Sequence, residues 1–93
     1  MNLKMYVGGI FAAALLGGCG VANETTVCTS SPQSDWLNQE QFQAELLTDG
    51  YQIKEFIVTD GNCYEIYGQN AQGDKVEIYF NPVDGSIVKE EKH

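Results

Sequence analysis

The sequence predicts an α+β domain in which one N-terminal helix packs on an antiparallel β-meander of three to four strands. Two runs, residues 60–68 and 75–80, alternate apolar with polar side chains, which is the period of strands buried on one face only. Upstream of them, residues 38–50 have helical periodicity and capping residues at both ends. Turn residues flank the strand runs: Asp60-Gly61, Gly73-Asp74 and Asn81 to Gly85. Gly and Asn tolerate positive φ, and Pro has no N–H to donate to a sheet.

The N-terminal segment, residues 1–18, predicts an export signal of the lipoprotein type. Its apolar run over residues 5–16 is too short to span a bilayer comfortably. Residues 16–19 resemble a lipobox, in which small residues precede a cysteine that is lipidated, here Cys19. We therefore expect an exported protein of the bacterial cell envelope or periplasm, anchored to a membrane through Cys19. Ordinary signal cleavage after Ala22, which would leave a soluble periplasmic or secreted protein, stays open.

Residues 19–32 predict a flexible tether, and residues 33–90 predict the folded domain. The tether is polar and lacks periodicity, and Cys28 is its one unusual residue. If Cys19 is lipidated, Cys28 and Cys63 form an even pair in an oxidising compartment, and we expect a disulfide between them. That bond predicts that the tether partly covers the sheet near Cys63. Two free thiols, or an intermolecular bond through Cys28, remain the alternatives.

The helix is predicted from its caps and its apolar spacing. Asn38 is a favourable N-cap residue, and Gly50 is suited to end the helix in the left-handed conformation. Phe42 and Leu46 lie four residues apart and share a face, with Leu47 beside them. This face is expected to pack on the sheet.

The strands are predicted from alternation and its interruptions. Residues 51–58 form the first strand, in which the apolar parity changes halfway, so a bulge near Lys54-Glu55 is expected. A short fourth strand is expected at residues 86–88, and the charged tail, residues 89–93, is expected to be frayed. The side chains expected on the core face of the second and third strands are Tyr64, Ile66, Val76, Ile78 and Phe80.

These pieces together resemble the PepSY domain, the module of peptidase propeptides and YpeB-like proteins, in its small, exported, single-domain branch. The resemblance is carried by residues 50–56, 60–67 and 73–88 in that order and spacing, and Trp36 ahead of the helix also fits. It covers about residues 32–88. It implies a helix packed on a small antiparallel sheet, and a role in binding or restraining other proteins, often peptidases, outside the cytoplasm. It supplies no catalytic residues.

Composition and spacing exclude several functional classes. Thirteen acids stand against five lysines and no arginine, for a net charge of -8, which disfavours nucleic acid as a partner. One histidine, His93, and three scattered cysteines do not form a zinc site, and neither Asp-rich turn has the pattern of a calcium loop. Because His93 lies outside the domain, no serine or cysteine has a base to activate it. We therefore expect no enzyme, no metal, no cofactor and no small-molecule substrate.

The best binding candidate is the sheet face opposite the helix, here called the open face, where alternation places Glu65, Tyr67, Glu77 and Tyr79, with Lys54 nearby if the bulge allows. Tyrosine is enriched in protein interfaces, although tyrosines also fill cross-strand positions on solvated sheets. An acid/base pair of Glu65 and Glu77 is disfavoured, since carboxylates on an open face are usually solvated and unperturbed. The sequence thus indicates a non-catalytic envelope module that binds or modulates another protein, with a peptidase as the candidate. The alternative is a small structural envelope lipoprotein with no single dedicated partner.

Overall fold

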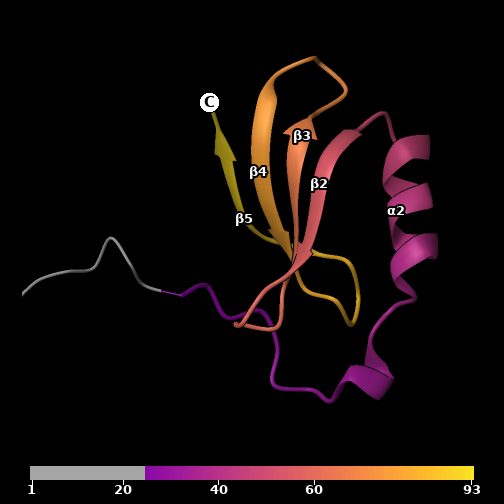
Figure 1. The fold of residues 1–93 in the computed structure, drawn as a ribbon, viewed down its shortest axis with the longest axis vertical. Helices are drawn as coiled ribbons and strands as arrows, with labels where there is room; N and C mark the ends of the chain where they lie inside the picture. The colour runs from indigo at the N-terminus through magenta and orange to yellow at the C-terminus, as the bar shows by residue number, and fades with distance from the viewer. Residues whose placement is uncertain (1–24) are drawn as a thin grey trace, which may run out of the picture.

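The computed structural model describes residues 25–93, which form one helix packed on a four-stranded antiparallel sheet (Figure 1). The predicted α+β class is therefore confirmed. The strands follow the chain order across the sheet and are β2 (Gln52–Val58), β3 (Tyr64–Gln69), β4 (Lys75–Phe80) and β5 (Ile87–Lys92). The expected export signal, lipid site and alternative cleavage site lie outside the described residues. Within residues 25–93 no helix is long and apolar enough to cross a membrane.

The helix α2 (Gln39–Thr48) begins and ends as its caps predict. The Asn38 side chain accepts a hydrogen bond from the Gln41 N–H at 2.9 Å, and Gly50 takes a positive φ of 101° just after the helix. Phe42 and Leu46 are buried against the sheet. Leu47, expected beside them, is instead 57% exposed, because a helix this short buries only a narrow stripe. A short 3₁₀ helix, η3 (Gln33–Asp35), precedes α2.

The predicted bulge lies where the parity of β2 changes. Ile53 pairs with Gly68 and Glu55 pairs with Tyr67, so Lys54 is the extra residue. The bulge restores a single core face, since Phe56 then lies opposite Ile66 and Val58 opposite Tyr64.

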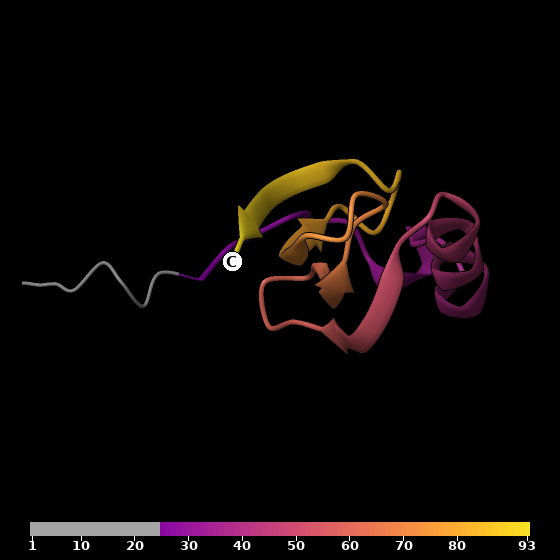
Figure 2. The same cartoon turned by 90° about the horizontal axis from the view of Figure 1, so that it is seen from above.

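The C-terminal tail is ordered, which corrects the expectation of a frayed end. β5 spans Ile87–Lys92 and pairs antiparallel with β4, from Phe80 opposite Ile87 to Val76 opposite Lys92. All six residues of β5 are exposed, so their side chains carry no burial signal. Backbone pairing along β4 holds the strand instead, and its Lys and Glu side chains are typical of a charged sheet edge. Figure 2 shows β5 at one side of the curved sheet and α2 at the other, beside β2.

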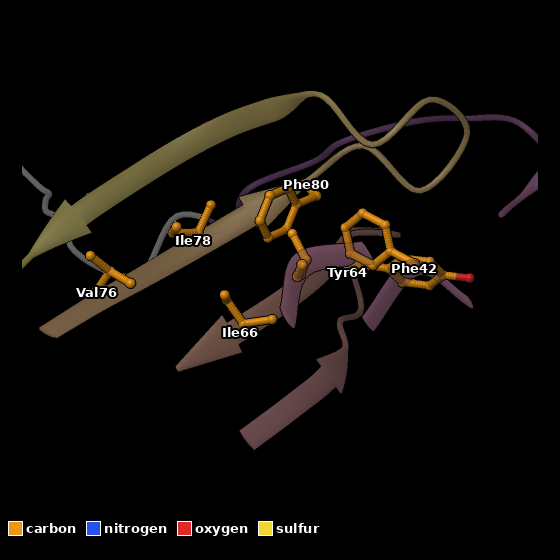
Figure 3. Packing of buried hydrophobic residues seen from close by; sticks show 7 residues of the cluster. Phe42, Tyr64, Ile66, Val76, Ile78 and Phe80 are labelled. Atoms are coloured by element: carbon orange, nitrogen blue, oxygen red, sulfur yellow. The ribbon is translucent and has the colours of Figure 1, made fainter. Parts of the chain in front are cut away.

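The hydrophobic core is centred on Tyr64 (Figure 3). Its ring lies 5.3 Å from that of Phe42, 5.2 Å from that of Phe56 and 5.7 Å from that of Trp36, measured between centroids. Trp36 is partly buried and donates its Nε1 hydrogen to the Ser31 carbonyl, so it belongs to the core and not to an exposed binding surface. The predicted core-face residues are all buried: Tyr64, Ile66, Val76, Ile78 and Phe80.

The predicted disulfide joins Cys28 to Cys63 and fixes the N-terminal segment to the turn between β2 and β3. The Cys28 N–H donates to the Gly61 carbonyl, and the Asn62 side chain donates to the Thr29 carbonyl. Gly61 is required here for close approach, because a Cβ would lie 1.9 Å from the Thr26 carbonyl oxygen. The positive φ of this turn is taken by Asn62 at 61°. The segment therefore covers the turn as expected.

Candidate functional site

The open face brings the four predicted residues together. Glu65 and Tyr67 come from β3, and Glu77 and Tyr79 come from β4. The register places Glu65 opposite Tyr79 and Tyr67 opposite Glu77, so each tyrosine faces an acid and the two acids are diagonal neighbours. The alternation of the two strands was sufficient to predict this grouping. Its role in binding stays a prediction.

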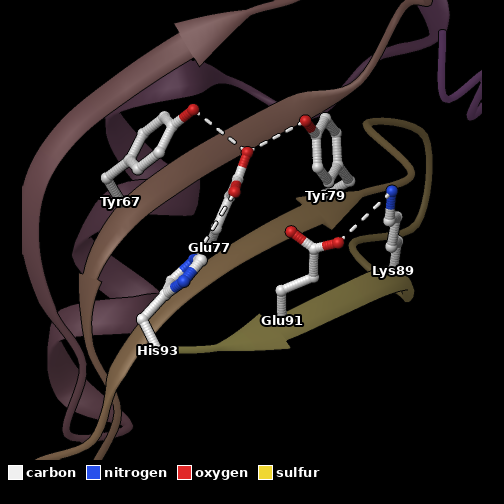
Figure 4. Close-up of polar contacts among 6 residues, drawn as sticks. All are labelled: Tyr67, Glu77, Tyr79, Lys89, Glu91 and His93. Atoms are coloured by element: carbon white, nitrogen blue, oxygen red, sulfur yellow. Dashed lines mark hydrogen bonds and ion pairs between the residues drawn. The ribbon is translucent and has the colours of Figure 1, made fainter. Parts of the chain in front are cut away.

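Glu77 is the acceptor at the centre of this face (Figure 4). The hydroxyls of Tyr67 and Tyr79 each donate to Glu77 Oε2 at 3.0 Å. Its other oxygen, Oε1, lies 3.7 Å from His93 Nε2. The pKa of Glu77 is lowered, chiefly by a hydrogen bond from Glu65 and further by those from the two tyrosines. Glu77 is therefore ionised, and its charge fixes both tyrosine rings.

Glu65 corrects the expectation of a solvated, unperturbed carboxylate, because its side chain is only 5% exposed. Burial, and after it the hydrogen bond with Glu77, raise the pKa of Glu65 to about 7. On this face it is flanked by Ile57 of β2 and Tyr79 of β4. Those cross-strand neighbours remove water that a strand considered by itself would retain.

The two tyrosines have raised pKa values and remain neutral at physiological pH. The hydrogen bond to Glu77 raises the pKa of Tyr67 to about 12. Burial and the same acceptor raise the pKa of Tyr79. Tyr67 is 37% exposed at the rim of the site, whereas Tyr79 is half-buried. An exposed ring whose hydroxyl is already held has lost much of its rotational freedom before any partner arrives.

β5 adds a charged border that the sequence did not predict. Lys89 lies opposite Tyr79 with its Nζ 5.7 Å from the ring centroid, and it pairs with Glu91 at 3.6 Å. Glu91 lies opposite Glu77, and His93 follows it. The expectation of a frayed tail concealed these residues. Residues 89–93 are all polar or charged, so no alternation of apolar and polar side chains could have revealed them.

Three of these side chains offer ligand atoms within 4.8 Å of one another: Glu77, Glu91 and His93. Carboxylates and an imidazole are suitable zinc ligands. Glu91 and His93 are exposed, however, and exposed acidic groups of this kind are common without a metal. We assign no metal to them.

A groove of about 510 Å³ adjoins the open face where β2 carries its bulge. Tyr67 and His93 belong both to its wall and to the face, and Lys54, the bulge residue, also lines it. The sequence placed Lys54 near the site only if the bulge allowed it. The bulge does bring Lys54 there, and Lys54 supplies a positive charge at one end of an acidic surface.

The open face, its charged border and the groove form one continuous candidate site. The model of the peptidase propeptide and YPEB domain family matches residues 9–91 of the chain. Searches of curated proteins and of solved structures found no match.

Proposed function

Because the chain belongs to the peptidase propeptide and YPEB domain (PepSY) family, we propose that it is an exported, non-catalytic module that binds another protein of the cell envelope. We propose a peptidase as the class of partner, since the family description links the domain to peptidase propeptides. Binding alters such a partner by occupying its surface. No residue of this chain has a chemical step in that account.

The observation that carries the proposal is the open face itself. Tyr67 is a partly exposed aromatic side chain whose hydroxyl is fixed by Glu77, at the edge of a groove. Such a ring offers apolar contact area at little cost in conformational entropy. The acids around it favour a partner surface that presents Lys or Arg, because charge complementarity speeds association and selects among partners.

Capture from envelope extracts tests this proposal. We expect the tagged chain to retain one dominant partner in a saturable manner, and the untagged chain to compete for it. Tyr67→Ala should weaken this binding by about tenfold or more, which is the loss typical of a central aromatic contact.

Leu47→Ala is the matched control, because Leu47 is an exposed apolar residue on the outer side of α2. It should leave the affinity unchanged. Weak capture of many proteins without saturation would favour a structural lipoprotein instead. Equal losses in the two variants would contradict the open face as the binding surface.

We also propose that the protein is held at a membrane by lipid on Cys19, on the basis of the lipobox-like residues 16–19. Intact-mass analysis of protein from the membrane fraction should give a chain that begins at Cys19 and carries acyl mass. A chain that begins at Asn23 without acyl mass would contradict lipidation and support the soluble form.

A further inference from the structure

Glu65 is a buried acid with an oxygen that lacks a hydrogen-bond donor. Its Oε2 atom is buried and has no hydrogen-bond partner. The hydroxyls of Tyr67 and Tyr79, on the same face, have one hydrogen each, and both donate to Glu77 Oε2. An ionised carboxylate accepts hydrogen bonds and donates none, so an ionised Glu65 would leave a buried charge without a donor.

No cation among the described residues offsets that charge. Ile57 lies opposite Glu65 on β2, and the N-terminal segment contributes Cys28, whose disulfide to Cys63 is uncharged. Lys89 is directed to Tyr79 and Glu91, and the His93 imidazole is directed to Glu77. The titratable and charged groups that face the two acids from β2, β3, β4, β5 and the chain end are Lys54, Glu55, Tyr67, Tyr79, Lys89, Glu91 and His93. Among the described residues no ion pair joins Lys54 to either acid.

We propose that Glu65 and Glu77 form a proton-binding pair, in which Glu65 is a neutral carboxylic acid that donates its hydrogen to the ionised Glu77. Protonation turns the unpaired acceptor of Glu65 into a donor and removes one of two adjacent negative charges. Glu77 then receives three hydrogen bonds, from Tyr67, Tyr79 and Glu65. The pair thus makes the order of the open face depend on one proton.

The direction of the pH effect follows from linkage. The pKa of Glu65 is about 7 in the folded chain, above its ordinary value of 4.5, so the folded state binds more protons between these values. The unfolding free energy therefore falls as the pH rises from 4.5 through 7. Loss of the proton leaves two ionised carboxylates as diagonal neighbours on the face that carries the two tyrosines. This inference concerns the free domain and does not require the proposed partner.

Carboxyl NMR of the ¹³C-labelled domain tests the pair directly. We expect the Glu65 carboxyl carbon to titrate with a midpoint near 7, and the Glu77 carbon to titrate below 4.5. The Tyr67 and Tyr79 ring signals should shift in the same step as Glu65. Ordinary titration of both acids near 4.5 would overturn the proposal.

Unfolding measured at a pH of about 5.5 and of about 8.5 gives a second readout. The wild type should unfold at lower denaturant at the higher pH. Glu65→Gln keeps a donor for Glu77 and should lose most of this difference, whereas Glu91→Gln removes the same charge from an exposed position and should keep it. His93→Gln should also keep the stability difference between the two pH values, which would exclude the imidazole as the source of that difference. A full difference in Glu65→Gln, or its loss in either control, would contradict the shared proton.

Discussion

Tyr64 shows how one side chain of the β3 strand connects the two layers of the domain. Its ring is 2% exposed and contacts the rings of Trp36, Phe42 and Phe56. Its hydroxyl donates to the Leu37 carbonyl at 2.6 Å, just before the N-cap of α2. The position of the helix entrance therefore depends on a hydrogen bond from the centre of the sheet as well as on apolar packing.

Tyr64→Phe is expected to keep the ring packing and remove this hydrogen bond. Because the Leu37 carbonyl then loses its partner, we expect the free energy of unfolding to fall by about 1–2 kcal/mol. Tyr51→Phe is the matched control, since Tyr51 also packs against the core, and it should change stability by less than about 0.5 kcal/mol. Denaturant midpoints measure both. Equal midpoints for the two variants would show that the hydroxyl of Tyr64 contributes nothing.

At this same scale, alternation predicted which residues share a face but not how deeply each is buried. Tyr64 and Ile66 were placed correctly in the core, and Glu65 was placed correctly on the opposite face. Its burial follows from Ile57 and Tyr79, which only the register of neighbouring strands brings beside it. A single strand read along the chain carries no such information.

At the scale of elements, the segment over residues 25–31 is fixed to the turn between β2 and β3 by the Cys28–Cys63 disulfide. The bond closes a loop with a sequence separation of 35 residues. In the chain-entropy account, such a loop stabilises the folded state by about 4 kcal/mol. That is a large share of the stability of a domain this small.

We expect the double variant Cys28→Ser, Cys63→Ser to lose roughly 2–4 kcal/mol of unfolding free energy. Denaturant unfolding of the variant should agree with that of the reduced wild type, since both lack only the crosslink. If oxidised and reduced wild type unfold at the same denaturant concentration, the bond does not stabilise the domain.

The elements also show where prediction from sequence succeeds and fails. The cap at Asn38, the stop at Gly50 and the bulge at Lys54 each have a local chemical signature, and all three were predicted. The start of β5 at Ile87 and Val88 was predicted as a short fourth strand. Its extension over residues 89–92 has no such signature, because these charged, exposed side chains show no apolar face and their pairing depends on the edge of β4. The missed extension also concealed the border of Lys89, Glu91 and His93.

At the scale of the whole molecule, the elements that stabilise the fold are separate from the proposed binding surface. The helix and the aromatic cluster pack on the other face of the sheet, so they stabilise it without covering Tyr67 and Tyr79. The net charge of -8 surrounds that face with a surface that repels anions. Both properties suit a small module that presents one sheet face to a basic partner.

Position-specific photocrosslinking in the cell that produces the protein tests the central claim most directly. A photoreactive phenylalanine analogue is placed at Tyr67 on the open face or at Leu47 on the outer side of α2, both of which are exposed. The account predicts one discrete crosslinked species from position 67, abolished by excess chain without the probe, and none from position 47. A discrete species from position 47 alone, or none from either position in a stably folded chain, would contradict recognition through the open face.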